Sequence, residues 1–142
     1  MNICFVCTGN TCRSVMAERI MKKQLKTLGV KDIKVSSKGL NATGENIAEN
    51  AKVTLKAHGC LASNRKSVQL KKVDAKTVYI AMTDAHKAHI ASKQVISFSE
   101  LIGREVLDPY GQGVDVYMAC FDTLSQGIQV LINKIIKMRG LL

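Results

Sequence analysis

Short apolar stretches alternate in this sequence with segments in which apolar residues recur every three or four positions, and this alternation limits the possible folds more than any other feature. The short stretches are typical of buried strands and lie at Asn2–Val6, Asp32–Ser37, Thr77–Met82 and Gln94–Phe98. Strands that alternate with helices indicate βαβ units. We therefore expect an α/β fold with three layers, in which helices cover both faces of a four-stranded parallel sheet.

The intervening segments predict the helices. Glycines stand where the first two should end, because glycine readily adopts the left-handed conformation that terminates a helix. The predicted helices run from near Cys12 to Gly29, from Ile47 to Gly59, over Thr83–Ser92, and from Val116 to Ile135. No internal repeat, linker or change of composition divides the chain, so residues 1–142 are expected to form a single domain.

Apolar residues make up 46% of the chain, too many for a disordered protein. No apolar run approaches the roughly 18 residues of a membrane-spanning helix, and no charged segment precedes the apolar residues 3–6 as it would in a signal peptide. The five cysteines are an odd number and lack the spacing of a secreted disulfide scaffold, which favours reduced thiols. The sequence thus predicts a cytoplasmic protein without a membrane partner.

The balance of 21 Lys and Arg against 11 Asp and Glu gives a net charge of +10, which favours anionic partners. The basic residues are scattered along the chain rather than grouped. Because there is no Trp and only three Phe and three Tyr, no stacking platform for single-stranded nucleic acid is apparent. We interpret the charge as a solvated surface and expect no nucleic-acid partner. The oligomeric state stays open.

Residues 5–14, FVCTGNTCRS, join the first predicted strand to the first predicted helix. Ligands of open parallel sheets bind beyond the carboxyl ends of the strands, where this loop lies. Backbone N–H groups at a helix N-terminus attract anions. Gly9 permits a positive φ in such a loop, and Asn10 is the non-glycine residue that tolerates it best. Arg13 adds a planar fork that matches two phosphate oxygens.

Cys7 stands at the start of this loop. A helix N-terminus and a nearby arginine both favour the thiolate, so Cys7 is expected to be a nucleophile, and Ser14 could donate a hydrogen bond to it. A phosphate bound in the loop would then lie with its phosphorus above the sulfur. By contrast, Cys4 lies within the strand, and no second Cys-x2-Cys pair exists for a metal site. Cys4, like Cys60 and Cys120, is therefore expected to pack in the core.

Other familiar sites are not supported. Residues 39–44 have the glycine spacing of half a Walker loop, but Glu45 and Asn46 replace the required lysine and hydroxyl residue, so no nucleotide cofactor is expected. His86 and His89, three residues apart on a predicted helix, could bind a metal, but the sequence offers no third ligand. We interpret these histidines as part of a solvated helix face and expect no metal.

Residues 7–14, CTGNTCRS, resemble the signature loop of the low-molecular-weight protein tyrosine phosphatases, and the resemblance extends along nearly the whole chain. The further matching segments are Met16-Ala17-Glu18, Ala81-Met82-Thr83 and Asp108-Pro109-Tyr110-Gly111. The resemblance implies a protein phosphatase with Cys7 as nucleophile, Arg13 as phosphate clamp and Asp108 as general acid. It also implies a set of substrate-binding positions, at Thr8, Gly9, Asn10, Thr11, Cys12, Ser14 and Tyr110.

Asp108 also suits this chemistry by its own properties. Transfer of a phosphoryl group from oxygen or nitrogen to sulfur requires protonation of the leaving group, which a carboxylic acid opposite the nucleophile can provide. The resulting phosphocysteine must be hydrolysed to inorganic phosphate, and the same residue, as a carboxylate, can activate the water. Pro109, the single proline of the chain, stiffens the loop that holds Asp108.

The resemblance also bears on the substrate. Members directed at phosphotyrosine generally carry a bulky aliphatic residue at the position of Thr11 and an aromatic residue in the loop after the second strand. Threonine is similar to the phosphoarginine-directed members, and residues 40–43 contain no aromatic side chain. Only Tyr110 could stack on a phenyl ring. The sequence therefore favours phosphoarginine over phosphotyrosine, with phosphorylated proteins as partners.

Three alternatives stay open. An arsenate reductase shares this fold and loop but needs further cysteines, usually after the third strand, and residues 81–100 contain none. A phosphocysteine carrier must not hydrolyse its phosphate, which Asp108 would promote. A basic binding module would show salt-sensitive RNA binding without turnover. Separately, Cys12 lies five residues from Cys7 across the loop, and we expect peroxide to join the two as a disulfide that protects Cys7 from over-oxidation.

Overall fold

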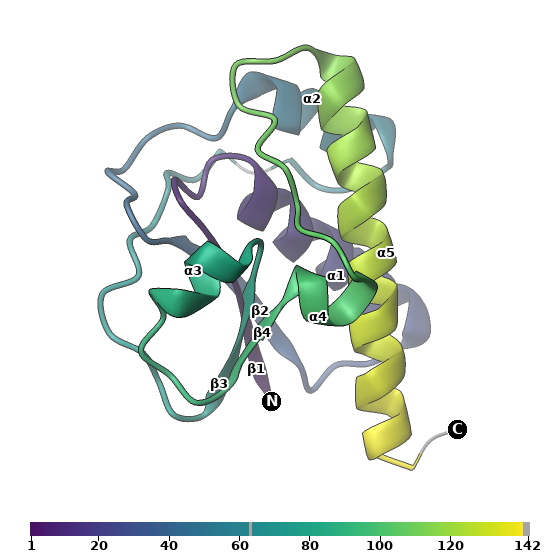
Figure 1. The fold of residues 1–142 in the computed structure, drawn as a ribbon. Helices are drawn as coiled ribbons and strands as arrows, with labels where there is room; N and C mark the ends of the chain where they lie inside the picture. Colours follow the sequence, from purple (N-terminus) through teal and green to yellow (C-terminus); the bar gives the residue numbers. More distant parts are fainter. Residues whose placement is uncertain (63, 141–142) are drawn as a thin grey trace.

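The structure, a computed structural model, describes residues 1–62 and 64–140. Its elements are β1 (Asn2–Cys7), α1 (Arg13–Leu28), β2 (Lys34–Gly39), α2 (Glu49–Ala57), β3 (Thr77–Ala81), α3 (Asp84–Ala88), β4 (Val95–Ser97), α4 (Phe98–Ile102) and α5 (Val114–Met138) (Figure 1). The strands form one parallel sheet in the order β2-β1-β3-β4. The predicted α/β fold, a four-stranded parallel sheet with helices on both faces, is confirmed. That residues 1–142 form one domain stays a prediction.

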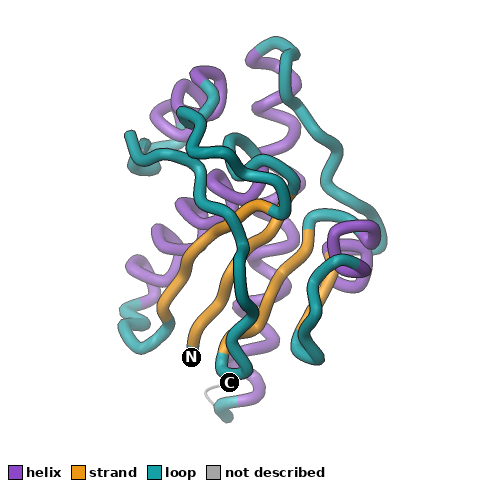
Figure 2. Tube along the Cα trace, turned by 90° about the vertical axis from the view of Figure 1, so that its left-hand side faces the viewer, coloured by secondary structure: helices purple, strands orange, loops and turns teal. Residues whose placement is uncertain are grey.

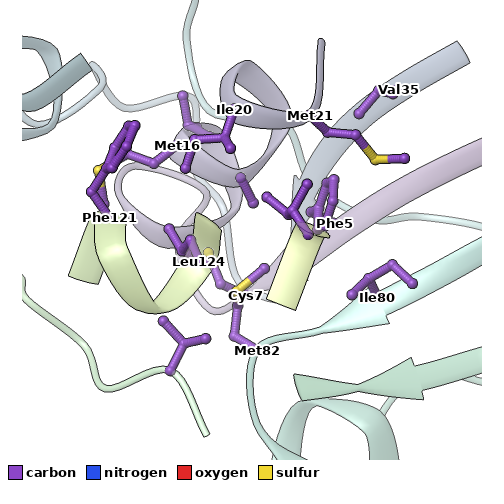
Figure 3. Packing of buried hydrophobic residues seen from close by; sticks show 14 of the residues in the cluster. Phe5, Cys7, Met16, Ile20, Met21, Val35, Ile80, Met82, Phe121 and Leu124 are labelled. Atoms are coloured by element: carbon purple, nitrogen blue, oxygen red, sulfur yellow. The ribbon is translucent and has the colours of Figure 1, made fainter. Parts of the chain in front are cut away.

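The larger core lies between one face of the sheet and helices α1 and α5, which run behind the strands in Figure 2. Figure 3 shows part of this core, in which Phe5 and Ile80 of the sheet face Met21 and Leu124 of the helices. Burial of such side chains removes apolar surface from water, the dominant favourable contribution to folding. Because α1 and α5 are fixed in this way, the loop that precedes α1 has a rigid base.

The opposite face of the sheet carries a smaller core. Cys4 and Tyr79 contact Ile90, just after α3, and Leu70 and Val73 from the irregular segment before β3. Figure 2 shows a loop that crosses the near face of the sheet, opposite α1 and α5. This face is therefore covered partly by α3 and its continuation and partly by extended chain. Cys4, Cys60 and Cys120 are all buried, as predicted.

Some element boundaries differ from the predictions. Strand β2 begins and ends two residues later than predicted, because it pairs with β1 residue for residue as far as Cys7 and Gly39. The predicted fourth strand ends at Ser97, and Phe98 instead begins α4, which the sequence did not indicate. Phe98 packs on α5 where Gly127 leaves room for its ring, since a Cβ at position 127 would overlap it. Tertiary packing thus decides the conformation of Phe98.

None of the helices within the described part of the chain combines the length and apolarity that a membrane crossing requires.

Candidate active site

The loop between β1 and α1 lies at a switch point of the sheet. From the end of β1, the chain returns through α1 to β2 on one side, whereas β3 and β4 lie on the other side. Open parallel sheets bind ligands at such points. A cavity of about 290 Å³ opens there, and it gathers eight of the ten predicted site residues: Cys7, Thr8, Gly9, Thr11, Cys12, Arg13, Asp108 and Tyr110, together with Asn41 and Glu45.

The sulfur of Cys7 lies where the core meets this cavity. Its side chain is buried among apolar residues, near Met82 and Leu124 in Figure 3. Its Sγ lies 2.9 Å from Ser14 Oγ, and the backbone N–H of Asn10 donates to it at 3.3 Å. The contact that the sequence predicted between Ser14 and Cys7 is therefore present.

Asn10 and Ser14 do not line the cavity but hold the loop from behind. Asn10 has a φ of 56°, the left-handed conformation predicted for it, and is fully buried. Its Nδ2 donates to Ser14 Oγ at 2.7 Å and to Ser37 Oγ at 3.0 Å. Its Oδ1 accepts from Arg65 Nη1 at 3.1 Å and from the N–H of Val68 at 3.0 Å. A buried amide with all these partners fixes the loop in one conformation.

The prediction of a positive φ at Gly9 is wrong, because the left-handed residue of the loop is its neighbour Asn10. The glycine that the loop requires is Gly39, at the end of β2. A Cβ at Gly39 would lie 2.6 Å from the carbonyl oxygen of Thr8, closer than real Cβ contacts come. In the sequence, Gly39 matches only the glycine spacing of half a nucleotide loop. A glycine just after the predicted second strand, at the same edge of the sheet as the loop, was the signal that could have identified it.

Arg13, the first residue of α1, is buried and aimed across the cavity toward Asp108. Its Nη1 donates to the carbonyl oxygen of Val106 at 2.9 Å, and its Nη2 lies 3.7 Å from Asp108 Oδ2. The connection from α4 to α5, which carries Val106 and Asp108, passes the loop after β1 in Figure 1. The guanidinium is thus positioned by one backbone contact and faces the carboxylate of the opposite loop.

Asp108 and Tyr110 stand on the outer rim of the cavity. The Asp108 side chain is 55% exposed, and its Oδ1 accepts the N–H of Tyr110 at 3.1 Å. Gln112 Nε2 donates to the carbonyl oxygen of Asp108 at 3.2 Å, and Asn50 Nδ2 donates to that of Gln112 at 2.9 Å. Tyr110 is 65% exposed, so its ring can border a bound group without enclosing it.

The interpretation of His86 as part of a solvated helix face is wrong. His86 is buried, and its Nε2 lies 2.8 Å from Thr8 Oγ1 in the loop, whereas His89 is exposed as predicted. Burial, and after it the nearby charge of Arg13, lowers the pKa of His86 to about 4. His86 is therefore a neutral side chain that positions Thr8. Within the described residues no three His, Cys, Asp or Glu side chains form a cluster that could hold a metal ion.

Behind the loop lies a network of charged side chains that the sequence pattern did not indicate. Glu18 is buried, and its Oε1 accepts from Ser37 Oγ at 2.7 Å and from Arg65 Nη2 at 3.2 Å, while its Oε2 pairs with Lys22 at 2.8 Å. Burial opposes ionisation of Glu18, but hydrogen bonds from Lys22 and Ser37 outweigh it and lower the pKa of this carboxyl. Through Ser37 and Arg65 the network holds Asn10, and thereby the loop.

Cys12 is the N-cap residue of α1 and lines the cavity. Its Sγ lies 3.2 Å from Tyr117 Oη. Burial raises the pKa of its thiol, although hydrogen bonds with Tyr117 and Thr11 partly offset this. The predicted disulfide with Cys7 stays a prediction, since all five cysteines are free.

The disulfide prediction can be tested with Cys12→Ser. After exposure to peroxide, we expect wild type to regain most of its activity when thiol is added, whereas Cys12→Ser should lose it irreversibly, because Cys7 then lacks a partner thiol. Cys60→Ser, another buried cysteine outside the cavity, is the control. Equal recovery in wild type and Cys12→Ser would exclude the disulfide.

Comparison with known proteins agrees with this geometry. The family described as low molecular weight phosphotyrosine protein phosphatase matches residues 2–140. A protein-arginine-phosphatase of Geobacillus stearothermophilus is 37% identical over 145 residues, which cover 94% of this chain and 95% of that protein. A low molecular weight protein-tyrosine-phosphatase, PtpB of Staphylococcus haemolyticus, is 33% identical over 133 residues, which cover 87% of this chain and 92% of that protein.

Among solved structures, the YwlE arginine phosphatase is similar over 100% of both chains, with a TM-score of 0.86 and 32% identity. That structure is a cysteine-to-serine mutant with a phosphorylated active-site serine. The chain belongs to the low molecular weight phosphotyrosine protein phosphatase family. It is a hydrolase of the protein-phosphatase class, as the sequence predicted.

Proposed function

We propose that this protein removes phosphoryl groups from phosphorylated proteins through a phosphocysteine on Cys7, with phosphoarginine as the preferred substrate. The observation that carries the proposal is the single cavity that Cys7, Arg13 and Asp108 share. The phosphorylated active-site serine of the arginine phosphatase mutant supports it, because a serine in place of the cysteine has there accepted the phosphoryl group.

In the first step, Cys7 Sγ attacks phosphorus while the bond from phosphorus to the leaving oxygen or nitrogen breaks. Asp108 donates its proton to the leaving atom. In the second step, a water molecule attacks the phosphocysteine, Asp108 takes up a proton from that water, and the thiolate leaves. The products are the dephosphorylated side chain and inorganic phosphate, and no cofactor takes part.

The other residues of the loop bind the phosphoryl oxygens. Thr8, Gly9, Thr11 and Cys12, which precede α1, line the cavity with Arg13, the first residue of that helix, and backbone N–H groups at a helix N-terminus favour an anion. The Arg13 fork stabilises the charge that is spread over these oxygens in the transition state. Asn10 and Ser14 keep the loop and the sulfur in position through the hydrogen bonds described above.

The preference for phosphoarginine rests on the polarity of the cavity wall. Thr11, Asn41 and Glu45 line it, and their side chains carry oxygen atoms that can accept hydrogen bonds from the N–H groups of a phosphoguanidinium. A phenyl ring gains more from apolar walls, and Tyr110, exposed at the rim, is the one aromatic side chain among the described residues that line the cavity. The proposed partners are phosphorylated proteins of the cytoplasm. The five free thiols fit this reducing compartment.

The direct test compares wild type on two peptides that differ only in carrying phosphoarginine or phosphotyrosine. We expect a higher kcat/KM for phosphoarginine. Turnover of phosphotyrosine alone would return the assignment to a tyrosine phosphatase. Reduction of arsenate to arsenite, with thiols oxidised to a disulfide, would favour a reductase, and stable phosphocysteine without release of phosphate would favour a carrier.

Thr11→Ile tests the proposed specificity residue. Isoleucine removes the hydroxyl acceptor and adds bulk at the cavity wall, so kcat/KM for phosphoarginine should fall at least tenfold, which is about 1.4 kcal/mol of transition-state binding. The value for phosphotyrosine should stay within about twofold of wild type. Thr27→Ile, at an exposed position of α1, is the matched control. A parallel loss on both substrates would show that residue 11 supports the loop but does not select the substrate.

A further inference from the structure

A second cavity adjoins the loop between β1 and α1. Its volume is about 750 Å³, and its walls include Leu70, Lys71 and Lys72 from the segment before β3 and His86 and His89 from α3 and its end. Thr8 lines this cavity as well as the one that holds Cys7. The two cavities therefore meet at a single residue of the loop.

The charge of the second cavity is positive. Lys71 and Lys72 are both exposed at its edge, whereas none of the described residues that line it is Asp or Glu. Glu105, whose charge reaches His86, lies outside the lining and accepts the N–H of Asp84 at 2.6 Å. Apolar side chains of the lining, Leu70 among them, can contact the aliphatic part of a ligand. The cavity thus suits a side chain with a short apolar stem and an anionic end.

The wall between the two cavities is a neutral hydrogen-bonded contact. Thr8 Oγ1 and His86 Nε2 are 2.8 Å apart, and His86 is buried. Its Nδ1 is buried without a hydrogen-bond partner in the described residues. Figure 1 shows α3, which carries His86, beside the end of the sheet where this loop lies. An occupant of the second cavity would therefore contact the same threonine that borders the phosphoryl group.

We propose that this second cavity recognises an acidic side chain of the protein substrate, close in sequence to the phosphorylated residue. The inference rests on the proposed function, which supplies a phosphorylated protein in the first cavity. An extended peptide advances about 3.3–3.6 Å per residue. A side chain one to three positions from the phosphorylated residue can therefore pass Thr8 and enter the second cavity while the phosphoryl group occupies the first. Lys71 and Lys72 bind the carboxylate, and the enzyme thereby selects phosphorylated sites in acidic surroundings.

The test uses two matched phosphopeptides, with glutamate or glutamine at the three positions on each side of the phosphorylated residue. At low salt, wild type should prefer the glutamate peptide about fivefold in kcat/KM, as expected for two partly exposed ion pairs, and added salt should reduce this ratio. In Lys71→Ala/Lys72→Ala the ratio should fall below about twofold. In Lys71→Glu/Lys72→Glu it should invert, which a merely structural role of the lysines would not produce.

Lys134→Ala/Lys137→Ala, two exposed lysines of α5, removes the same net charge elsewhere and should keep the wild-type ratio. A wild-type ratio near one, or an unchanged ratio in the Lys71 and Lys72 variants, would overturn the proposed recognition site. Failure of wild type to hydrolyse either peptide and p-nitrophenyl phosphate would instead overturn the proposed function. The two failures are therefore distinguishable.

Discussion

Replacement of Cys7 by serine is expected to lower kcat for an aryl phosphate more than about 10³-fold. The hydroxyl of serine does not ionise near neutral pH, so the loop would hold a phosphoryl group without an effective nucleophile beneath it. The proposed phosphate site should persist, because the substitution leaves the loop backbone and Arg13, which Val106 holds in place, unchanged. Inorganic phosphate should thus bind Cys7→Ser within about threefold of its wild-type Kd, as measured by calorimetry.

The control for this experiment is Cys60→Ser, which changes a buried cysteine outside the cavity and should keep most of the activity. Thermal unfolding of both variants shows whether the chain still folds. Residual activity of Cys7→Ser above a few per cent of wild type would mean that another group is the nucleophile. Loss of phosphate binding together with activity would mean that the loop had collapsed.

Much of the fold could be predicted because its signals are local. The first helix was predicted to run from near Cys12 to Gly29. In the structure Cys12 is its N-cap, and Gly29 ends it with a φ of 73°. The end of the fourth strand was predicted one residue too late, because an apolar run does not show where a strand ends. Phe98 continues that run but begins α4, since its ring fits against Gly127 of α5. A contact between residues so far apart has no local pattern.

The same contrast holds for the candidate site. Gly9, Asn10 and Arg13, between a predicted strand and a predicted helix, indicated an anion-binding loop, and the structure brings Cys7, Asn10 and Ser14 within hydrogen-bond distance of one another. The side chains that support the loop come from distant segments. His86 reaches Thr8 across 78 residues, and Arg65 reaches Asn10 across 55. Polar residues in those segments look like ordinary surface residues until the fold buries them, so sequence alone had no means to select them.

Asp108→Asn is the second change with a large expected effect. Asparagine keeps the shape of the side chain but cannot donate a carboxylic proton, so kcat should fall about 10²–10⁴-fold on a substrate with a poor leaving group. The change also removes a negative charge 3.7 Å from Arg13 Nη2. Inorganic phosphate should therefore bind at least as tightly as in wild type, which separates lost chemistry from lost binding. Asp122→Asn, an exposed position of α5, is the control with the same change of charge.

A series of aryl phosphates distinguishes the two roles that Asp108 could have. If it protonates the leaving oxygen, the penalty of Asp108→Asn should shrink as the leaving group becomes more acidic, because a good leaving group departs without a proton. If Asp108 only orients Arg13, the penalty should be the same for every member of the series, since all of them bind the phosphoryl group alike. The exposed position of Asp108 at the rim, opposite the buried sulfur, fits the first role, because a leaving group must point away from Cys7 and toward solvent. A constant penalty across the series would contradict that assignment and would leave protonation of the leaving group to water.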